Sequence, residues 1–478
     1  MNQTASKWIL IVIALLGLGL SSCEWFKPAR QSQSGPVAPP DDELDEIQGK
    51  RVFDPVTGTW RVVHVVTGKV DTVHWKVLPE ETYKPIVTST PLPSGTTTPS
   101  TPSTMPREVV LMLPFFANNL TGTTPDPNSL WAIQFYAGAK MAYDELASRG
   151  FRIHLTVFDT EGSEARVREL MRRPDLLKAD LVIGPYKRSN VSLMADFVKK
   201  EKMPLVVPHT ANYGMTEANP WYIQVNPSLK RHCEAIMRHA RQRYKPADML
   251  LVSLENEVNA GSFEYFQQAN RKFATSPADT QRIREVKIPN DPSKFNQIDL
   301  KPYLRKGRPN VVLVPSWSSE AFVYSLLRHL MEFKTTGEEV IVYGMPQWME
   351  YEQVDFEFFE RLQVHVSSAT YVNKGDERVR QFQRRYFDNY GTIPTDEAFL
   401  GYDIMRYFGE MVGQYGRDLS ARIDAVPFDV LRGRFEFERV VYEPEKHLED
   451  LNYFDQLENR FVHILRFQDY RFQPASMP

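Results

Sequence analysis

The chain has few cysteines and almost no net charge. The first shortage excludes a framework of internal disulfides, and the second argues against a nucleic-acid-binding function. Its 478 residues include two cysteines and carry a formal net charge of -3. A near-neutral chain lacks the electrostatic footprint of a nucleic-acid-binding protein, and short basic runs such as Arg384-Arg385 are typical of solvated surfaces. We therefore expect no nucleic-acid partner.

Motifs that mark common enzyme classes are also missing. The sequence contains no Gly-rich phosphate loop, no Gly-x-Ser-x-Gly elbow and no His-Glu-x-x-His motif. The ten histidines are scattered, and His232 and His239 lie seven residues apart on one expected helix, too far for joint metal ligation without a third group. Convergence of His154, His209 and His365 in space stays open. We expect no catalytic residue, no metal and no cofactor.

A long apolar run occurs at the N-terminus, where Lys7 precedes residues 8–20. This run is too short to span a bilayer comfortably but has the length of a signal-peptide core. It ends in Leu20-Ser21-Ser22-Cys23, which resembles the bacterial lipoprotein box, where the cysteine is acylated and becomes the mature N-terminus. We predict a lipoprotein signal peptide over 1–22 and lipidation of Cys23. Acyl chains such as palmitate would hold the protein at a membrane by burying methylenes, at about 0.8 kcal/mol each.

The second cysteine has no partner for an internal disulfide once Cys23 is acylated. Cys233 shares one face of an expected helix with Leu229, Ile236 and Ala240. This apolar spacing predicts a buried structural thiol rather than a nucleophile.

Three segments of different composition lie between Cys23 and residue 106. Residues 23–48 are rich in Pro, Ser, Gln and Asp and predict a disordered tether. Residues 49–84 predict a small β-rich segment with strands over 60–66 and 70–77, which must pack on something because two or three strands alone are marginal. Residues 85–106 form a Thr/Ser/Pro linker that is extended and semi-stiff.

Residues 107–208 alternate between short apolar runs and helical patterns. Residues 109–113 are apolar on both faces, as in a strand buried inside a parallel sheet. A helix follows with Trp131, Phe135, Gly138, Ala142 and Leu146 on one stripe, and Gly138 and Ala142 would let it sit close to a sheet. Further strands are expected over 153–159, 181–184 and 204–207. This alternation requires right-handed crossovers and a parallel sheet.

The same rhythm restarts after residue 226. Strands are expected over 249–254, 311–315, 340–343 and 364–367, with helices over 263–273 and 321–333 between them. Two later helices are expected over 377–390 and 397–415. The pattern indicates a second α/β lobe.

Several segments carry a family resemblance: residues 136–142 (YAGAKMA), 182–185 (VIGP), 203–208 (MPLVVP) and 222–228 (YIQVNPS). They occur in the order seen in type I periplasmic binding proteins, the leucine/isoleucine/valine-binding group, which the chain resembles over roughly 107–470. Gly184-Pro185-Tyr186-Lys187, followed by Asn190, also resembles the same fold in envelope lipoproteins that regulate peptidoglycan synthases.

The resemblance implies an α/β fold of two doubly wound parallel-sheet lobes joined by three interlobe crossovers. Lobe one would span 107–224 and 371–430, lobe two 225–370 and 431–470, and a tail 471–478. The crossings are expected near Gln224, Thr370 and Leu431. Residues 434–437 and 461–467 look like the antiparallel strands that finish the second lobe.

Ligand-binding residues are expected on loops, because the carboxyl ends of the strands in both lobes should face one cleft. The candidates are Phe116, Asp159, Tyr186, Lys187, His209 and Thr210 from lobe one, Glu255 and Trp317 from lobe two, and Tyr222 and Tyr371 at the crossings. Exposed amides where the Ser189 helix and the Thr210 loop begin would receive a carboxylate, and Glu255 an amino group. Alternatively, Asp159 caps a helix, Trp317 fills the lobe interface and Phe116 belongs to the core.

Two functions remain open. Proteins of the branched-amino-acid group usually carry small hydroxyl residues where this chain has Tyr186-Lys187-Arg188, and an Ala-Thr pair where it has His209-Thr210-Ala211. Bulky or basic side chains shrink or recharge a pocket. The first hypothesis is a non-catalytic, lipid-anchored envelope protein that captures a small polar or amino-acid-like solute for an ABC transporter or a sensor. The second is an envelope scaffold or regulator with a degenerate pocket that binds a protein partner or peptidoglycan. Both place the chain in the bacterial cell envelope, at the outer membrane or the periplasmic face.

Overall fold

The computed structural model describes residues 50–54, 59–63, 106–276, 279–334, 337–447, 450 and 452–475. The chain divides into two compact units, residues 1–97 and 98–478. In the first unit, β1 (Lys50–Asp54) and β2 (Thr59–Val63) pair antiparallel, with Asp54 opposite Thr59. Strand β2 overlaps the strand predicted over 60–66, and β1 is an addition to the prediction. The predicted signal peptide, Cys23, the predicted tether, the strand predicted over 70–77 and the predicted linker up to residue 105 lie outside the described residues.

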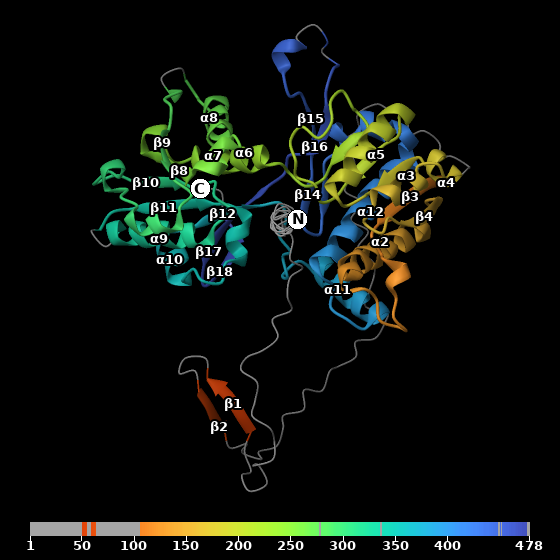
Figure 1. Ribbon diagram of the computed structural model, residues 1–478, viewed down its shortest axis with the longest axis horizontal. Coiled ribbons are helices and arrows are strands. Elements are labelled where there is room, and N and C mark those ends of the chain that lie inside the picture. The colour runs from red at the N-terminus through yellow and green to blue at the C-terminus, as the bar shows by residue number, and fades with distance from the viewer. Residues whose placement is uncertain are drawn as a thin grey trace, which may run out of the picture. The chain divides into compact units, whose positions relative to one another are not determined.

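The second unit contains two lobes, each built on one seven-stranded sheet (Figure 1). The first sheet has the order β15-β16-β7-β6-β5-β3-β4 and the second β18-β17-β12-β11-β10-β8-β9. In each lobe the first five strands of the chain stand in the order second, first, third, fourth, fifth, and all five are parallel. The two-lobed α/β fold expected from the sequence is confirmed.

The strands and helices of the first lobe have the following bounds. The sheet contains β3 (Arg107–Leu113), β4 (Ile153–Asp159), β5 (Leu181–Ile183), β6 (Leu205–Val207), β7 (Tyr222–Gln224), β15 (Phe437–Val440) and β16 (Gln456–Asn459). The helices are α2 (Leu130–Ser148), α3 (Glu164–Leu170), α4 (Pro174–Leu177), α5 (Arg188–Glu201), α11 (Glu377–Tyr390) and α12 (Asp396–Tyr415). A separate hairpin joins β13 (Phe428–Val430) to β14 (Gly433–Phe435).

The second lobe has a corresponding set of elements. Its sheet contains β8 (Met249–Leu254), β9 (Arg284–Ile288), β10 (Asn310–Leu313), β11 (Val340–Gly344), β12 (His365–Ser368), β17 (His463–Gln468) and β18 (Arg471–Pro474). Its helices are α6 (Leu229–Ala240), α7 (Glu255–Asn259), α8 (Ser262–Lys272), α9 (Glu320–Lys334) and α10 (Phe356–Arg361). Strand β9 is an addition to the predicted set.

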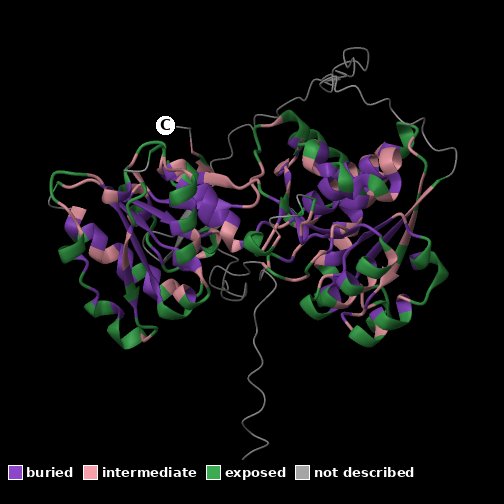
Figure 2. Ribbon diagram, turned by 90° about the horizontal axis from the view of Figure 1, so that it is seen from above, coloured by how far each residue is buried: buried purple, intermediate pink, exposed green. Residues whose placement is uncertain are grey.

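Helices cover both faces of the first sheet, as the unbroken apolar run of β3 predicts. On one face Val109 and Leu111 pack with residues of α2 and α12, and on the other Val110 and Met112 pack with residues of α3 and α5. Buried residues accordingly line the strands of both lobes (Figure 2). In the second lobe Cys233 is fully buried in the core, as predicted, and burial raises the pKa of its thiol.

Two parts of the predicted lobe boundaries are wrong. Residues 437–440 and 456–459 form β15 and β16, which extend the sheet of the first lobe because β16 pairs parallel with β7. The third crossing therefore lies at 460–462, between β16 and β17, and not near Leu431. Residues 471–474, predicted as a tail, form β18 and pair with β17.

The close helix packing in the first lobe occurs between α2 and α12. A Cβ on Gly138 would lie 1.8 Å from the backbone oxygen of Ala398, and a Cβ on Gly401 would lie 1.9 Å from the backbone oxygen of Phe135. Gly138 thus lets α2 approach another helix, not the sheet as we expected. The two glycines bring the backbones of α2 and α12 into direct contact.

We predict that Gly138→Ala destabilises the protein, because the added methyl group meets backbone that must shift. Overpacking of this kind costs about 1–3 kcal/mol, which exceeds the gain in helix propensity of about 1 kcal/mol. Urea unfolding of the full chain measures the loss. Gly375→Ala is the control, because its Cβ would meet one side-chain atom at 3.1 Å. Equal stability of the two variants would contradict the close-packing argument.

Candidate functional site

The carboxyl ends of both sheets meet at the hinge between the lobes. The chain leaves the first sheet at the end of β7 and enters α6 of the second lobe after residues 225–228. It leaves the second sheet at the end of β12 and enters α11 of the first lobe after residues 369–376. Since both connections are short and start at carboxyl ends, the loops that follow the strands of each lobe lie at the side where the lobes join.

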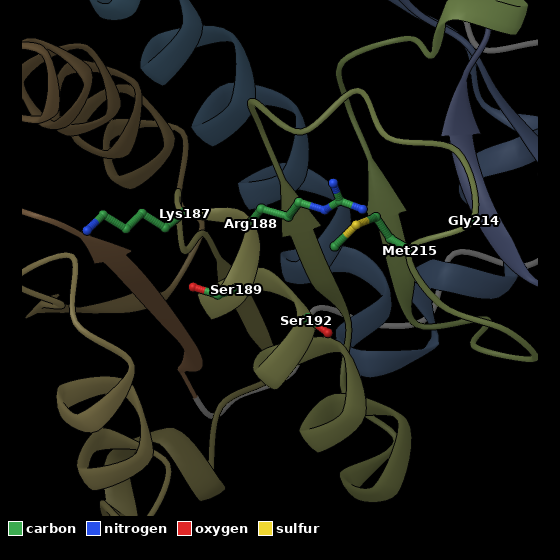
Figure 3. Close-up of a pocket in the computed structure, with 6 residues that line it drawn as sticks. All are labelled: Lys187, Arg188, Ser189, Ser192, Gly214 and Met215. Carbon is green, nitrogen blue, oxygen red and sulfur yellow. The ribbon is translucent and has the colours of Figure 1, made fainter. Parts of the chain in front are cut away.

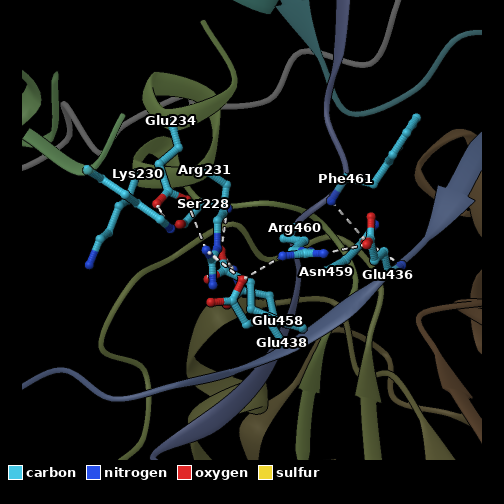
Figure 4. Close-up of polar contacts among 12 residues, drawn as sticks. Ser228, Lys230, Arg231, Glu234, Glu436, Glu438, Glu458, Asn459, Arg460 and Phe461 are labelled. Atoms are coloured by element: carbon cyan, nitrogen blue, oxygen red, sulfur yellow. Dashed lines mark hydrogen bonds and ion pairs between the residues drawn. The ribbon is translucent and has the colours of Figure 1, made fainter. Parts of the chain in front are cut away.

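A buried ion network holds the first and third crossings together (Figure 4). Arg231 of α6 donates from Nε to Glu458 of β16 at 3.2 Å and from Nη1 to Glu438 of β15 at 3.2 Å. Glu458, which is 1% exposed, also accepts the backbone N–H of Ser228 at 2.7 Å. Glu234 completes the network by accepting from Arg231 at 2.9 Å. One helix of lobe two is thereby fixed to the last strands of lobe one.

The second crossing is fixed by the β13–β14 hairpin. The backbone oxygen of Arg432 accepts the N–H of Tyr371 at 2.9 Å and lies 3.1 Å from Nε2 of His463. Arg432 is itself bound through its N–H and its Nε to the buried carboxylate of Asp403, both at 3.3 Å. Tyr371 is therefore part of the hinge in this conformation.

A hollow of about 600 Å³ lies at the carboxyl edge of the first sheet (Figure 3). It is lined by Lys187, Arg188, Ser189, Ser192, Gly214 and Met215. Arg188 reaches toward Met215, whereas Lys187 extends the opposite way (Figure 3). Next to Gly214, Tyr213 accepts a hydrogen bond from Lys230 of lobe two at 3.4 Å, so the hollow adjoins the contact between the lobes.

The charge around this hollow is positive. Lys187 is the N-cap of α5 and makes no side-chain capping bond, and Arg188 begins the helix. The first turn of an α-helix presents unpaired N–H groups and the positive end of the helix dipole. Two cations at this end are unfavourable for the helix alone and favourable for an anion beside it.

An aromatic cluster packs at the same edge. Tyr186 lies 4.4 Å from Trp131 and 5.0 Å from His209 between ring centroids. Nε2 of His209 is 2.9 Å from Oε2 of Glu397 in α12. Burial, with a smaller effect from Glu397, raises the pKa of the Tyr186 hydroxyl. This cluster brings two predicted site residues together with Trp131 and Glu397, which the prediction did not include.

Two other candidates hold the loop after β3. Asp159 accepts the backbone N–H groups of Phe115, Phe116 and Ala117 at 2.8, 3.2 and 2.8 Å, and that of Glu161 at 2.9 Å. Phe116 is kept in the left-handed region with φ 50°. Asp159 is thus an anchor of this loop and does not cap the helix that follows it, because the N-cap of α3 is Ser163. The side chains of Lys187 and Phe116 both pass close to Gly162, where an added Cβ would meet Lys187 Nζ at 3.1 Å and Phe116 Cζ at 3.4 Å.

In the second lobe, Glu255 is exposed at the start of α7 and Trp317 is half-buried. The backbone N–H of Trp317 donates to the buried carboxylate of Glu257 at 2.9 Å. Of the remaining candidates, Thr210 is buried at the edge of lobe one, and Tyr222 is fully buried in the core of that lobe. Tyr222 therefore does not reach a surface in this conformation.

A family model described as "Periplasmic binding protein" matches residues 120–445. This match covers more than half of the chain and agrees with the two equally wound lobes. The chain belongs to the periplasmic binding protein family. It is of type I, as the two equally wound sheets also indicate. No curated protein sequence matches it.

Solved structures show the same fold at low sequence identity. A branched-chain amino acid ABC transporter protein from Rhodospirillum rubrum has a TM-score of 0.55 at 17% identity, over 78% of this chain and 100% of that one. A ligand-binding protein of the same transporter class from Burkholderia xenovorans has a TM-score of 0.52 at 12% identity, over 77% and 94%. LpoA from Haemophilus influenzae has a TM-score of 0.51 at 12% identity, over 78% and 59%.

His154, His209 and His365 do not converge in this structure. His154 is paired with Glu108 at the rim of lobe one, His209 lies in the aromatic cluster, and His365 is buried in lobe two. Within the described ranges, no group of three or more His, Cys, Asp or Glu residues is arranged to hold a metal ion. The same part of the chain has no helix with the length and apolarity to cross a membrane.

Sequence reasoning missed two carboxylates at the edges of the sheets. Glu257 accepts hydrogen bonds across 60 residues and Glu397 contacts a histidine 188 residues away. The sequence around an acidic residue on a predicted helix does not indicate that its carboxylate has a hydrogen-bond partner far away in the chain. Arg188 was identified as a departure from the family pattern, but only the hollow shows its position.

We predict that Glu458→Gln lowers the free energy of unfolding, because Arg231 and the Ser228 N–H lose a buried anionic acceptor. Breaking one partner of a buried ion pair costs about 3–5 kcal/mol. Urea unfolding of the full chain measures the change. Glu264→Gln is the control, since Glu264 pairs with Arg271 at an exposed site and such pairs contribute about 0–1 kcal/mol. A loss no larger than that of the control would refute the role of the network.

A second prediction concerns pH. Burial lowers the pKa of His232 from 6.5 to about 4 in the folded protein. The unfolded chain therefore binds a proton first, and the stability that neutral His232 contributes is present above pH 6.5 and lost as pH falls toward 4. Each pH unit in this window should cost about 1.4 kcal/mol from this residue. Unfolding of wild type and His232→Gln at pH 7, 6 and 5 should show a slope smaller by one proton in the variant. Substituting the exposed His154 by Gln should leave that part of the slope in place.

Proposed function

We propose that this protein is a lipid-anchored, non-catalytic envelope binding protein that captures a small solute through a carboxylate. The hollow at the start of α5 carries the proposal, because Lys187 and Arg188 lie at a helix end that has no acidic residue in its first turn. The carboxylate would bind the N–H groups of α5 and the two cations. Cys23 would carry the acyl chains, and the loaded protein would deliver the solute to a transporter or sensor.

Hinge motion would complete the site. Three crossings connect the lobes, and the second lobe presents Glu255 at its carboxyl edge. Closure around a solute would bring this acid toward the amino or other polar group at the far end of the solute. Tyr186 and His209 would then cover its apolar part. From the ten predicted ligand residues this proposal keeps Phe116, Tyr186, Lys187, His209, Thr210, Glu255 and Trp317, leaves out Asp159, Tyr222 and Tyr371, and adds Arg188.

A second function has a specific observation in its favour. Asp159 and Glu257 occupy loop amides at the carboxyl edges of the two sheets, so fewer donors remain for a solute. The fold similarity to LpoA supports the same alternative. Under this alternative the protein is an envelope scaffold or regulator that binds a protein partner or peptidoglycan.

Calorimetry of the full chain in detergent, against amino acids, small carboxylates, peptides and cell-wall fragments, separates the two. Heat from a carboxylate-bearing solute supports the first function. Silence across the panel, together with one stoichiometric partner after crosslinking in native membranes, supports the second.

For the acid that binds, we predict that Arg188→Gln weakens affinity at least tenfold, equivalent to about 1.4 kcal/mol. Because Arg188 opposes the positive end of α5, its removal should also raise the free energy of unfolding by about 0.3–1 kcal/mol at low salt. The control is Lys200→Gln at the other end of α5, which should leave affinity unchanged and lower stability slightly. Equal affinity of wild type and Arg188→Gln would remove the hollow as the binding site.

A further inference from the structure

The same junction exists in both lobes, because both sheets are wound in the same order. The third strand is β5 in lobe one and β10 in lobe two, and a helix follows each, α5 and α9. In sheets of this order, ligands bind where the connections from two neighbouring strands leave on opposite faces of the sheet. Here this point lies beside the third strand. Lobe one has the open hollow described above on the β6 side of its third strand, whereas lobe two has a side chain of its own beside its third strand, on the β8 side.

That side chain is Glu257, which is 1% exposed. Its Oε1 accepts the N–H of Trp317 at 2.9 Å, the N–H of Ser318 at 2.9 Å and the hydroxyl of Ser318 at 2.7 Å. Its Oε2 accepts the hydroxyl of Ser253 at 3.0 Å. Across the described ranges, no lysine or arginine forms an ion pair with this carboxylate. Four uncharged donors therefore hold a buried anion.

The donors keep their places through contacts that do not involve Glu257. Nε1 of Trp348 donates to the backbone oxygen of Ser316 at 2.8 Å, and the hydroxyl of Tyr351 donates to the backbone oxygen of Trp317 at 3.3 Å. Trp348 is fully buried against Gly344, where a Cβ would lie 2.5 Å from the indole. The loop from 316 to 318 is thus set by two aromatic side chains. The fully buried hydroxyl of Ser316 has no hydrogen-bond partner among the described residues.

We propose that the β10–α9 junction is a carboxylate-binding site occupied by the protein's own Glu257, which blocks this junction to an anionic group of any solute. A buried carboxylate is expensive unless donors surround it, and donors placed to satisfy one carboxylate satisfy another of the same shape. The consequence rests on the proposed function: the solute's carboxylate is confined to the first lobe. The part that faces lobe two, beside exposed Glu255, is neutral or cationic.

The test removes Glu257 and offers acetate in its place. Acetate binding in lobe two must be distinguished from acetate binding in lobe one. The full chain therefore carries Arg188→Gln, which weakens anion binding in the hollow of lobe one. In this background, Glu257→Ala should become acetate-dependent: its Tm should rise with the logarithm of the acetate concentration above the Kd, by about 2 °C at ten times the Kd, relative to chloride at equal ionic strength. The background alone should show no such rise, because Glu257 fills the junction.

Two further variants decide the location. Ser318→Ala, added to Glu257→Ala, removes one donor and should weaken acetate binding several-fold. Glu255→Ala, two residues away and exposed, should create no acetate dependence. An acetate effect of the same size in all variants, or none in Glu257→Ala, overturns the inference. If Glu257→Ala does not fold in chloride, refolding yield in acetate replaces Tm: a higher yield supports the site, and equal yields overturn it.

The result of the acetate test does not depend on whether the proposed function is correct. Acetate dependence in the Arg188→Gln background arises in lobe two whether or not the hollow of lobe one binds solutes. Should acetate act on Glu257→Ala only while Arg188 is present, the anion sits in the hollow; the inference then fails and the proposed function stands.

Discussion

The arrangement of the two lobes depends on one buried guanidinium. Arg231 belongs to the first helix of lobe two, yet its Nε and Nη1 bind Glu458 and Glu438 on the last strands of lobe one. Burial of these charges costs desolvation energy that the pairing offsets only when every donor and acceptor is used. Glu458 meets this condition by also accepting the Ser228 N–H of the crossing. The interaction therefore fixes the relative position of the two lobes more than it adds to net stability.

This fixed register turns two similar sheets toward each other. Because the chain leaves each sheet at the carboxyl end of its fifth strand, the loops of both lobes converge on the hinge. Equal winding then gives the lobes equivalent junctions, β5–α5 and β10–α9. The two junctions differ in charge: Lys187 and Arg188 make the first cationic and open, and Glu257 makes the second closed. A fold with internal symmetry thus has two chemically different junctions at the ends of its third strands.

The candidate site was only partly accessible to sequence reasoning. Topology placed Tyr186, Lys187 and His209 at the carboxyl edge of the first sheet, where the structure has them, because carboxyl ends of parallel strands share one side of a sheet. It also nominated Asp159 and Tyr222, whose side chains serve the loop and the core instead. The end of a strand determines where the backbone of the following loop lies. The orientation of a side chain on that loop depends on its hydrogen-bonding and packing partners.

The sequence by itself determined the winding of each lobe, since buried parallel strands such as β3 and β8 are local apolar runs and the helices between them have local periodicity. It also determined the burial of Cys233, which follows from one helical face. Only the tertiary structure decided that β15 and β16 join the first sheet, and that Asp159 and Glu257 spend their carboxylates on backbone N–H groups 44 and 60 residues away. These outcomes rest on pairings between distant segments, and neither partner carries a local signal of the other.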